Sequence, residues 1–178
     1  MGAVVTRPFA PADVPDLLGV TQASGVFRAE EGDVAREVLE ACAARGHASG
    51  YFCRVAAAES GTGLEGFACW GPAPCTEGTF DLYWLVVHPR AQGRGIASRL
   101  LAEAESDAAR RGGRQLVAET SSTEPYAPAR SFYEERGFRL TARIPDFYRL
   151  GDAKVVYVKP LSPRRGGKQE RWNSGRRS

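Results

Sequence analysis

The stretch that decides the fold runs from Val86 to Ala97 and reads VVHPRAQGRGIA. Its two valines end an unbroken apolar run, a pattern typical of a buried strand. From its last residues onward, apolar side chains recur at helical spacing and predict an amphipathic helix over residues 94–111. The short turn that contains Gly93 and Gly95 therefore joins a buried strand to a long helix.

A helix that begins at this turn can bind an anion. The first turn of a helix has about four backbone N–H groups without helical partners and carries about half a positive charge. Small residues at Gly93, Gly95 and Ala97 let a phosphate reach those groups, although a plain tight turn explains the glycines equally well. The stretch lacks the lysine of a nucleotide P-loop, and Ser98 interrupts the G-x-G-x-x-G pattern. Three arginines could add charged contacts: Arg90, Arg94 and Arg99.

The rest of the chain alternates between strand and helix patterns. Strands are expected at residues 3–8, 51–57, 64–70, 80–87, 115–120, 138–144 and 154–159. Helices are expected at residues 11–25, 31–45, 94–111 and 128–136. The strand at 80–87 is the most apolar, and we expect it to be buried on both faces. The order mixes hairpins with βαβ units, which predicts an α/β or α+β domain with a mixed sheet.

Length and charge divide the chain into a body and a tail. The 178 residues suit one domain, expected at 1–160. Residues 161–178 hold six basic residues against Glu170 alone, so the tail carries +5 and the rest −2 of a net charge of +3. The basic residues are Arg164, Arg165, Lys168, Arg171, Arg176 and Arg177. We expect a disordered extension, and nucleic acid is an unlikely partner because Trp172 is the tail's single aromatic residue.

Composition excludes several classes of protein. The longest apolar run is far shorter than the roughly 18 residues that span a bilayer, and no signal-peptide stretch opens the chain. We therefore expect a cytoplasmic protein without a membrane partner. The four cysteines and two histidines show no zinc-ligand spacing, so we expect reduced, apolar cysteines and no metal.

Two motifs carry a resemblance to a known family. The sequence QGRGIA from Gln92 to Ala97 resembles the Q/R-x-x-G-x-G/A signature of the GNAT superfamily of N-acetyltransferases. A second block, ARSFYEERGF from Ala129 to Phe138, is similar to that family's A-x-x-F-Y-x-x-x-G-F pattern and follows about 40 residues later. The order of elements agrees over nearly the whole chain except the tail. The resemblance implies the GNAT acyl-CoA N-acyltransferase fold, with about seven strands and about four helices.

The resemblance also implies the cofactor and its binding residues. Acetyl-CoA would donate the acetyl group, with its pantetheine arm between the fourth and fifth strands. The backbone of Leu85, Val86 and Val87 would pair with that arm and polarise the acetyl carbonyl. The pyrophosphate would bind the N–H groups of the signature, which are those of Gln92, Gly93, Arg94, Gly95, Ile96 and Ala97.

Three residues are catalytic candidates. Tyr133 matches the tyrosine that protonates the departing CoA sulfur in many family members, although its position also suits a core aromatic residue. The acceptor amine must lose a proton before attack, and two carboxylates could accept it directly or through water. Asp81 shares strand parity with Tyr83, Leu85 and Val87, and Glu119 ends the neighbouring strand. Either acid could instead be a solvated strand-end residue or an ion-pair partner.

The acceptor side is expected at loops that resemble the family's acceptor-binding segments. The loop residues 146–148 faintly resemble the Tyr-Tyr loop of protein N-terminal acetyltransferases, although packing between the final strands explains them equally well. An acidic site would suit a cationic amine. The candidate acceptor-binding residues are Phe27, Glu30, Tyr126 and Tyr148.

The sequence thus predicts an acetyl-CoA-dependent N-acetyltransferase. The acceptor would be a primary amine of a small molecule, a peptide or protein N-terminus, or a lysine, and it would attack the thioester directly. The alternative is a module that binds CoA or acyl-CoA without turnover, in which case the three catalytic candidates are incidental. A homodimer is compatible with either interpretation.

Overall fold

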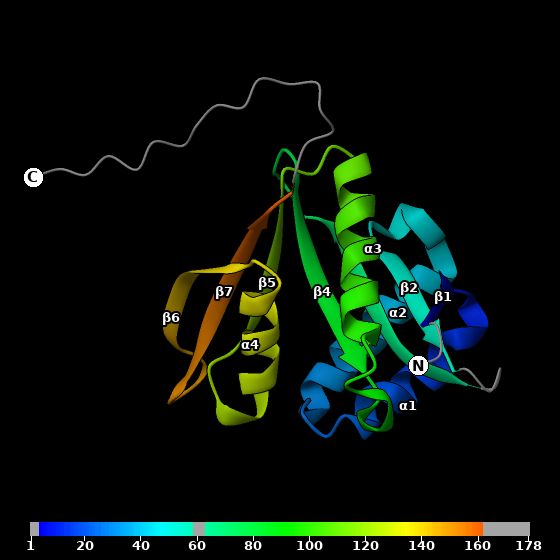
Figure 1. The fold of residues 1–178 in the computed structure, drawn as a ribbon, viewed down its shortest axis with the longest axis horizontal. Coiled ribbons are helices and arrows are strands. Elements are labelled where there is room, and N and C mark those ends of the chain that lie inside the picture. The colour runs from blue at the N-terminus through cyan, green and yellow to red at the C-terminus, as the bar shows by residue number, and fades with distance from the viewer. Residues whose placement is uncertain (1–3, 59–62, 162–178) are drawn as a thin grey trace, which may run out of the picture.

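The fold, seen in a computed structural model that describes residues 4–58 and 63–161, is built on one mixed sheet (Figure 1). The sheet has seven strands in the order β1-β2-β3-β4-β5-β7-β6. The strands are β1 (Val5–Pro8), β2 (Phe52–Ala57), β3 (Leu64–Pro72), β4 (Thr79–Val87), β5 (Gln115–Ser121), β6 (Arg139–Arg149) and β7 (Asp152–Pro160). The α-helices of the described residues are α1 (Val14–Ala23), α2 (Ala29–Arg45), α3 (Ile96–Arg110) and α4 (Ala127–Glu135).

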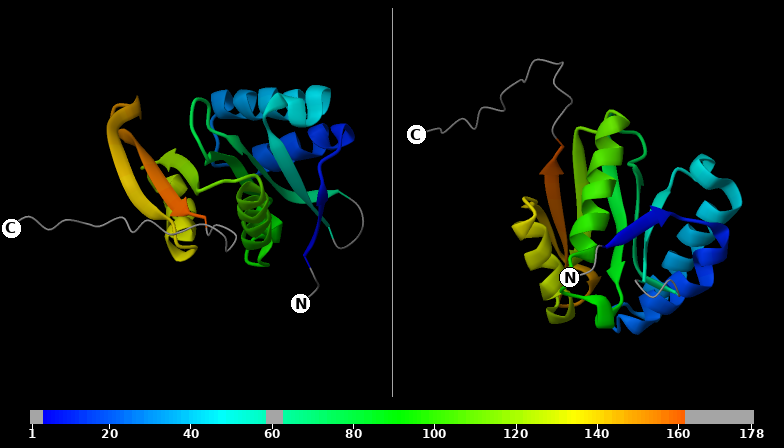
Figure 2. Two further views of the ribbon diagram at one scale, coloured as in Figure 1. Left: turned by 90° about the horizontal axis from the view of Figure 1, so that it is seen from above. Right: turned by 45° about the vertical axis from the view of Figure 1, so that its right-hand side comes forward.

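The helices cover the two faces of the sheet in pairs. α1 and α2 lie over one face, and α3 and α4 lie over the other, as the view from above shows (Figure 2). β4 and β5 are the one parallel pair of strands, and α3 is the crossover between them. The predicted fold class, a mixed sheet of about seven strands flanked by about four helices, is confirmed.

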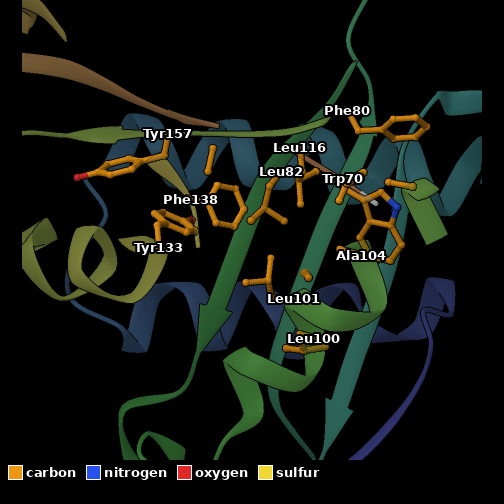
Figure 3. Packing of buried hydrophobic residues seen from close by; sticks show 14 of the residues in the cluster. Trp70, Phe80, Leu82, Leu100, Leu101, Ala104, Leu116, Tyr133, Phe138 and Tyr157 are labelled. Carbon is orange, nitrogen blue, oxygen red and sulfur yellow. The ribbon is translucent and has the colours of Figure 1, made fainter. Parts of the chain in front are cut away.

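Each face has its own apolar core. Leu100, Leu101 and Ala104 of α3 pack against β3, β4 and β5, together with Tyr133 of α4 (Figure 3). On the other face, Leu17 and other residues of α1 and α2 pack against β2, β3 and β4. Burial of such side chains contributes about 1.5–3 kcal/mol each. Both faces of the sheet are therefore packed against helices, and β4 and β5 lie between the two helix pairs.

β4 and β5 separate partway along their length. Their parallel pairing runs from Thr79–Gln115 to Leu82–Ala118 and ends there. Beyond that point β4 stays paired with β3 and β5 stays paired with β7. The two strands diverge toward the lower part of the molecule in Figure 1. This divergence leaves backbone groups along the inner edge of β4 without strand partners.

A bulge in β4 corrects two expectations about this strand. The register with β3 passes from Leu82 to Trp84 and leaves Tyr83 without a partner. Leu82 faces the core under α3, and Leu85 packs against that same core although its position has the opposite parity. Asp81 therefore does not share a face with Leu85 and Val87, because the extra residue reverses the alternation of side chains. The strand is also not buried on both faces, since Tyr83 is 36% exposed.

The segment expected as the last loop is part of a strand. β6 extends to Arg149 and therefore includes residues 146–148. Its pairing with β7 is irregular between Ile144 and Arg149, and Asp146 has a positive φ of 51°. The Asp146 carboxylate accepts a hydrogen bond from the Gly151 N–H at 2.7 Å, which tightens this bend. Sequence alone did not show that a strand can continue through Pro145 at an edge of the sheet.

Two expectations concern the ends of the chain and membranes. The basic tail at 161–178 lies, apart from Leu161, outside the described residues. Among the helices of residues 4–58 and 63–161, none is long and apolar enough to cross a membrane.

Candidate active site

A cleft of about 800 Å³ opens where β4 and β5 diverge. Its walls come from both strands, from the start of α2, from the start of α3 and from α4. Residues 81–87 of β4 all line it, including the predicted cofactor-binding residues Leu85, Val86 and Val87. The diverging strands therefore create a site that reaches through the sheet from one pair of helices to the other.

The turn before α3 has the backbone geometry that an anion site needs. Gly93 and Gly95 have φ values of +75° and +82°, which glycine adopts without strain. The first backbone hydrogen bond of the helix runs from the Arg99 N–H to the Gly95 carbonyl, at 3.0 Å. In the part of the chain that the structure describes, the N–H groups of Gly93, Gly95, Ile96 and Ala97 donate no hydrogen bond. A Cβ at either glycine would meet nothing within 4 Å, so the approach to these amides is open.

A second cavity of about 300 Å³ lies directly over this turn. Gln92, Gly93, Gly95, Ile96 and Ala97 all line it, and Gln92 and Ala97 also line the main cleft. The two cavities thus share residues at the start of α3. An extended molecule can lie along β4 and reach these backbone amides with its anionic end.

The arginines around this turn differ from expectation. Arg94 binds Glu65 of β3 at 2.8 Å, and Arg99 binds Glu103 of its own helix at 3.0 Å. Arg136 instead lines the cavity, donates to the Ser98 hydroxyl at 2.6 Å and lies 5.4 Å from the centre of the Phe132 ring. The sequence reasoning missed Arg136, which stands directly before the Gly-Phe end of the second motif.

Tyr133 lines the cleft with its hydroxyl and packs with its ring. The ring centre lies 5.3 Å from that of Phe138 and 5.9 Å from that of Tyr157 (Figure 3). The Tyr133 hydroxyl makes no hydrogen bond to any described residue. Every fully buried polar side-chain atom among the described residues does have a hydrogen-bond partner, so this hydroxyl is not fully buried. The hydroxyl therefore reaches the open space of the cleft. Burial raises the pKa of Tyr133 to about 12, so the phenol is neutral throughout the physiological range.

The two candidate bases lie on one face of the sheet but in different surroundings. Asp81 pairs with Val117 in the parallel register, and Glu119 follows two residues later on β5, so both carboxylates line the cleft. Burial raises the pKa of Asp81, the nearby Glu119 charge raises it further, and Lys154 opposes this. Glu119 forms an ion pair with Lys154 and is 46% exposed. The Asp81 carboxylate is therefore more basic than that of an ordinary aspartate, and the Glu119 carboxylate is held in an ion pair.

The wall of the cleft at the start of α2 contains a carboxylate that the sequence reasoning did not single out. Glu31, in the first turn of α2, accepts hydrogen bonds from the Tyr126 hydroxyl at 2.7 Å and from the Arg28 N–H at 2.9 Å. Phe27 packs edge-on against Trp84, with ring centres 5.1 Å apart. The predicted acceptor residues Phe27, Glu30 and Tyr126 all line the cleft. The Tyr126–Glu31 hydrogen bond links the segment before α4 to the first turn of α2.

Tyr148 lines the cleft from the bend in β6. Burial raises the pKa of this phenol, and the charges of Glu119 and Glu31 raise it further. The Arg28 guanidinium lies 5.8 Å from the centre of its ring. Strand β6 therefore contributes an aromatic wall to the site, although the expected loop is absent.

The charged side chains that line the cleft are acidic. Four carboxylates line it, and the described residues place no lysine or arginine in the lining. The carboxylates belong to Glu30, Glu31, Asp81 and Glu119. The turn before α3 contributes open backbone amides to the site, whereas α2, β4 and β5 contribute the carboxylates.

Comparison with known proteins identifies the family. A family model described as an acetyltransferase (GNAT) domain matches residues 49–140, more than half of the chain. A solved structure described as a GNAT-family acetyltransferase from Desulfovibrio desulfuricans is 42% identical, with a TM-score of 0.81, over 90% of this chain and 100% of its own. This chain belongs to the GNAT acetyltransferase family and is an N-acetyltransferase. The search of curated proteins found no match.

More distant structures show the same fold. The ribosomal-protein-S18-alanine N-acetyltransferase from Escherichia coli is 18% identical, with a TM-score of 0.72, over 96% of this chain and 100% of its own. An acetyltransferase from Salmonella typhimurium, solved with its cofactor acetyl-CoA, is 20% identical, with a TM-score of 0.71, over 94% of this chain and 99% of its own.

Proposed function

We propose that this chain transfers the acetyl group of acetyl-CoA to a cationic primary amine that enters from the α2 side of the cleft. The observation that carries the proposal is a row of backbone N–H groups that donate no hydrogen bond within the described residues: those of Gly93, Gly95, Ile96 and Ala97. The cavity over this turn shares lining residues with the cleft between β4 and β5. Such groups match the pyrophosphate of CoA, because a helix N-terminus favours an anion. Arg136 adds a cation at the same cavity.

The unpaired inner edge of β4 suits the rest of the donor. Strand pairing with β5 ends at Leu82, so the backbone of residues 83–87 has hydrogen-bonding capacity toward the cleft. The amide groups of a pantetheine arm can use this capacity in the manner of an added strand. The acetyl carbonyl would then lie near the bulge at Tyr83, between the Tyr133 hydroxyl and the Asp81 carboxylate.

The acidic wall supports a positively charged acceptor. Glu30, Glu31 and Asp81 attract an ammonium group and orient it toward the thioester. An ammonium group with a pKa of about 10.4 must lose a proton, which costs about 4.6 kcal/mol at pH 7. A base is therefore needed most for an acceptor of the lysine type, and an α-amino group with a pKa of about 7.8 needs it less.

Asp81 is the base that the surroundings favour. Its raised pKa makes the carboxylate a better proton acceptor than an ordinary aspartate. Glu119 holds Lys154 in an ion pair, and its role is to support the charge balance beside Asp81. Once the amine is neutral, its nitrogen attacks the acetyl carbonyl and the thiolate of CoA departs.

Tyr133 is placed to meet the departing sulfur. Its hydroxyl reaches the cleft and has no partner among the described residues, so it is available to a ligand. Because its pKa is about 12, the phenol donates a hydrogen bond to the developing thiolate at every physiological pH.

Titration calorimetry and thiol release test the proposal together. Acetyl-CoA should bind, and free thiol should appear when peptides with a free N-terminus, lysine peptides and aminoglycosides are offered in turn. An amine that is similar in size to these acceptors but uncharged serves as the control for the effect of charge. Binding without thiol release across the whole panel would contradict the proposed acceptor class, and no binding at millimolar acetyl-CoA would contradict the proposed donor.

A further inference from the structure

Three cysteines converge on the side of the sheet that α2 covers. Cys42 comes from α2, Cys53 from β2 and Cys69 from β3, and their sulfur atoms all lie within 4.8 Å of one another. The Cys42 and Cys53 sulfurs are 3.4 Å apart. All three thiols are free. Their spacing along the chain gives no sign of this cluster, because the fold of β2 against β3 creates it.

The cluster lies in apolar surroundings. Cys53 and Cys69 are direct partners in the antiparallel register, and Cys42 closes over them from the helix. Val38 and Trp84 belong to the same apolar group. Cys42 and Cys69 are buried, whereas Cys53 is only partly buried. Cys53 is therefore the least buried residue of the cluster.

The apolar surroundings favour one of the two reactions open to such a cluster. Three thiolates around a divalent ion would leave a net negative charge in an apolar site, which is costly without further partners. Burial raises the pKa of the Cys69 thiol and opposes its ionisation. Hydrogen bonds from Cys53 and Cys69 lower the pKa of Cys42, so Cys42 is the thiol of the cluster that ionises most readily. A disulfide carries no charge and needs only one thiolate to form.

We propose that Cys42 and Cys53 are a peroxide-sensitive pair that closes to a reversible disulfide between α2 and β2. The Cys42 thiolate attacks one oxygen of hydrogen peroxide, and the O–O bond breaks to release hydroxide and leave a sulfenic acid. The Cys53 sulfur then attacks the Cys42 sulfur and expels a second hydroxide, and the two protons come from the two thiols. In total, two thiols lose two electrons and one peroxide becomes two waters.

The bond would fasten α2 to the sheet. It closes a short loop, since the two cysteines are 11 positions apart, and such a crosslink restricts the unfolded chain. A typical crosslink of this kind raises the midpoint of thermal unfolding by about 5–10 °C in a chain of this size. The first turn of the same helix carries Glu30 and Glu31, so the oxidised form holds the acidic wall on a more rigid support.

Peptide mapping tests the proposal on the full chain. Cys75, which is exposed, is first replaced in a Cys75→Ser variant so that three thiols remain. Treatment with hydrogen peroxide should lower the intact mass by about 2 Da, and alkylation afterwards should label about two thiols fewer than in the untreated protein. Trypsin separates the cluster into the peptides 37–45, 46–54 and 55–90, each with one of its cysteines. The crosslink should join the first two, and a reductant should restore both thiols.

Two further variants and a metal measurement decide the outcome. In the same background, Cys69→Ala should still form the crosslink, and Cys42→Ala should keep both of its thiols at the same peroxide dose. A crosslink from 46–54 to 55–90, or unchanged thiols at a dose that oxidises free cysteine, would overturn the proposal. So would one equivalent of bound zinc or copper that protects all three thiols. Circular dichroism before oxidation confirms that each variant is folded.

Discussion

Removal of one oxygen atom, by Tyr133→Phe, should slow turnover without weakening the fold. The Tyr133 ring keeps its contacts with Phe138 and Tyr157 in the variant. The hydroxyl makes no hydrogen bond among the described residues, so its loss breaks no contact there. We therefore expect the free energy of unfolding to change by no more than about 0.5 kcal/mol.

The size of the kinetic effect follows from the raised pKa. Complete proton transfer from a phenol of pKa about 12 to a thiolate of pKa about 8.5 is uphill by about 4.8 kcal/mol. Tyr133 should therefore act by hydrogen bonding to the thiolate rather than by early proton transfer. A hydrogen bond to a charged group is worth about 1.5–3 kcal/mol, which corresponds to a loss of about 10-fold to 150-fold in kcat.

The assay is thiol release at saturating acetyl-CoA, with KM for acetyl-CoA measured in parallel. KM should change little, because the hydrogen bond forms mainly as charge develops on the sulfur. Tyr157→Phe is the matched control, since its hydroxyl donates to Glu134 at 2.9 Å rather than to the cleft. Equal kcat in wild type and Tyr133→Phe at every pH would refute the assigned role.

Three more substitutions test the base, the anion site and the acidic wall. Asp81→Asn should lower kcat by about 10²–10⁴-fold and remove the rise of kcat/KM with pH. Because folding raises the pKa of Asp81, the ionised carboxylate destabilises the folded state. Calorimetry at neutral pH should therefore find this variant at least as stable as wild type, and the difference in stability should vanish in acid. Gly95→Ala forces alanine to a φ of +82°, at about 1–2 kcal/mol, and should raise KM for acetyl-CoA, whereas Gly112→Ala, at +84° beyond the other end of α3, should cost similar stability and leave KM unchanged. Glu31→Gln keeps a hydrogen-bond acceptor for Tyr126 but loses a charge worth up to about 1 kcal/mol, so KM for a cationic acceptor should rise up to about fivefold while KM for acetyl-CoA stays constant.

The fold and the geometry of the turn before α3 could be predicted because their determinants are local. The turn from Gln92 to Ala97 carries its own conformation in Gly93 and Gly95, and the long helix after it has a clear apolar stripe. One of the two motifs that carry the resemblance to the GNAT family lies in this same turn. Such signals lie within a few residues of one another, so one sequence contains them in full.

The parts that escaped prediction depend on distant segments. The bulge at Tyr83 is set by the register between β3 and β4, and it moved Asp81 to a different face from Leu85. Glu31 enters the site only because α2 lies opposite the loop that carries Tyr126. No periodicity within one segment records such contacts between segments.

The cysteine cluster illustrates the same limit. Spacing along the chain shows no zinc motif, yet Cys53 and Cys69 are partners through the register of β2 with β3. Cys42 then joined them from a helix. Pairing across a sheet, rather than distance along the chain, decided which thiols meet.

The most direct test of the central claim is an amide chemical-shift titration of the isotopically labelled protein. The N–H groups of Gly93, Gly95, Ile96 and Ala97 should show the largest shifts on addition of acetyl-CoA, because they gain hydrogen bonds to the pyrophosphate. Acetyl-pantetheine, which lacks the pyrophosphate, should shift the β4 amides and leave these four nearly unchanged. Equal shifts at the four amides with both ligands, or none with acetyl-CoA while it binds elsewhere, would contradict the account.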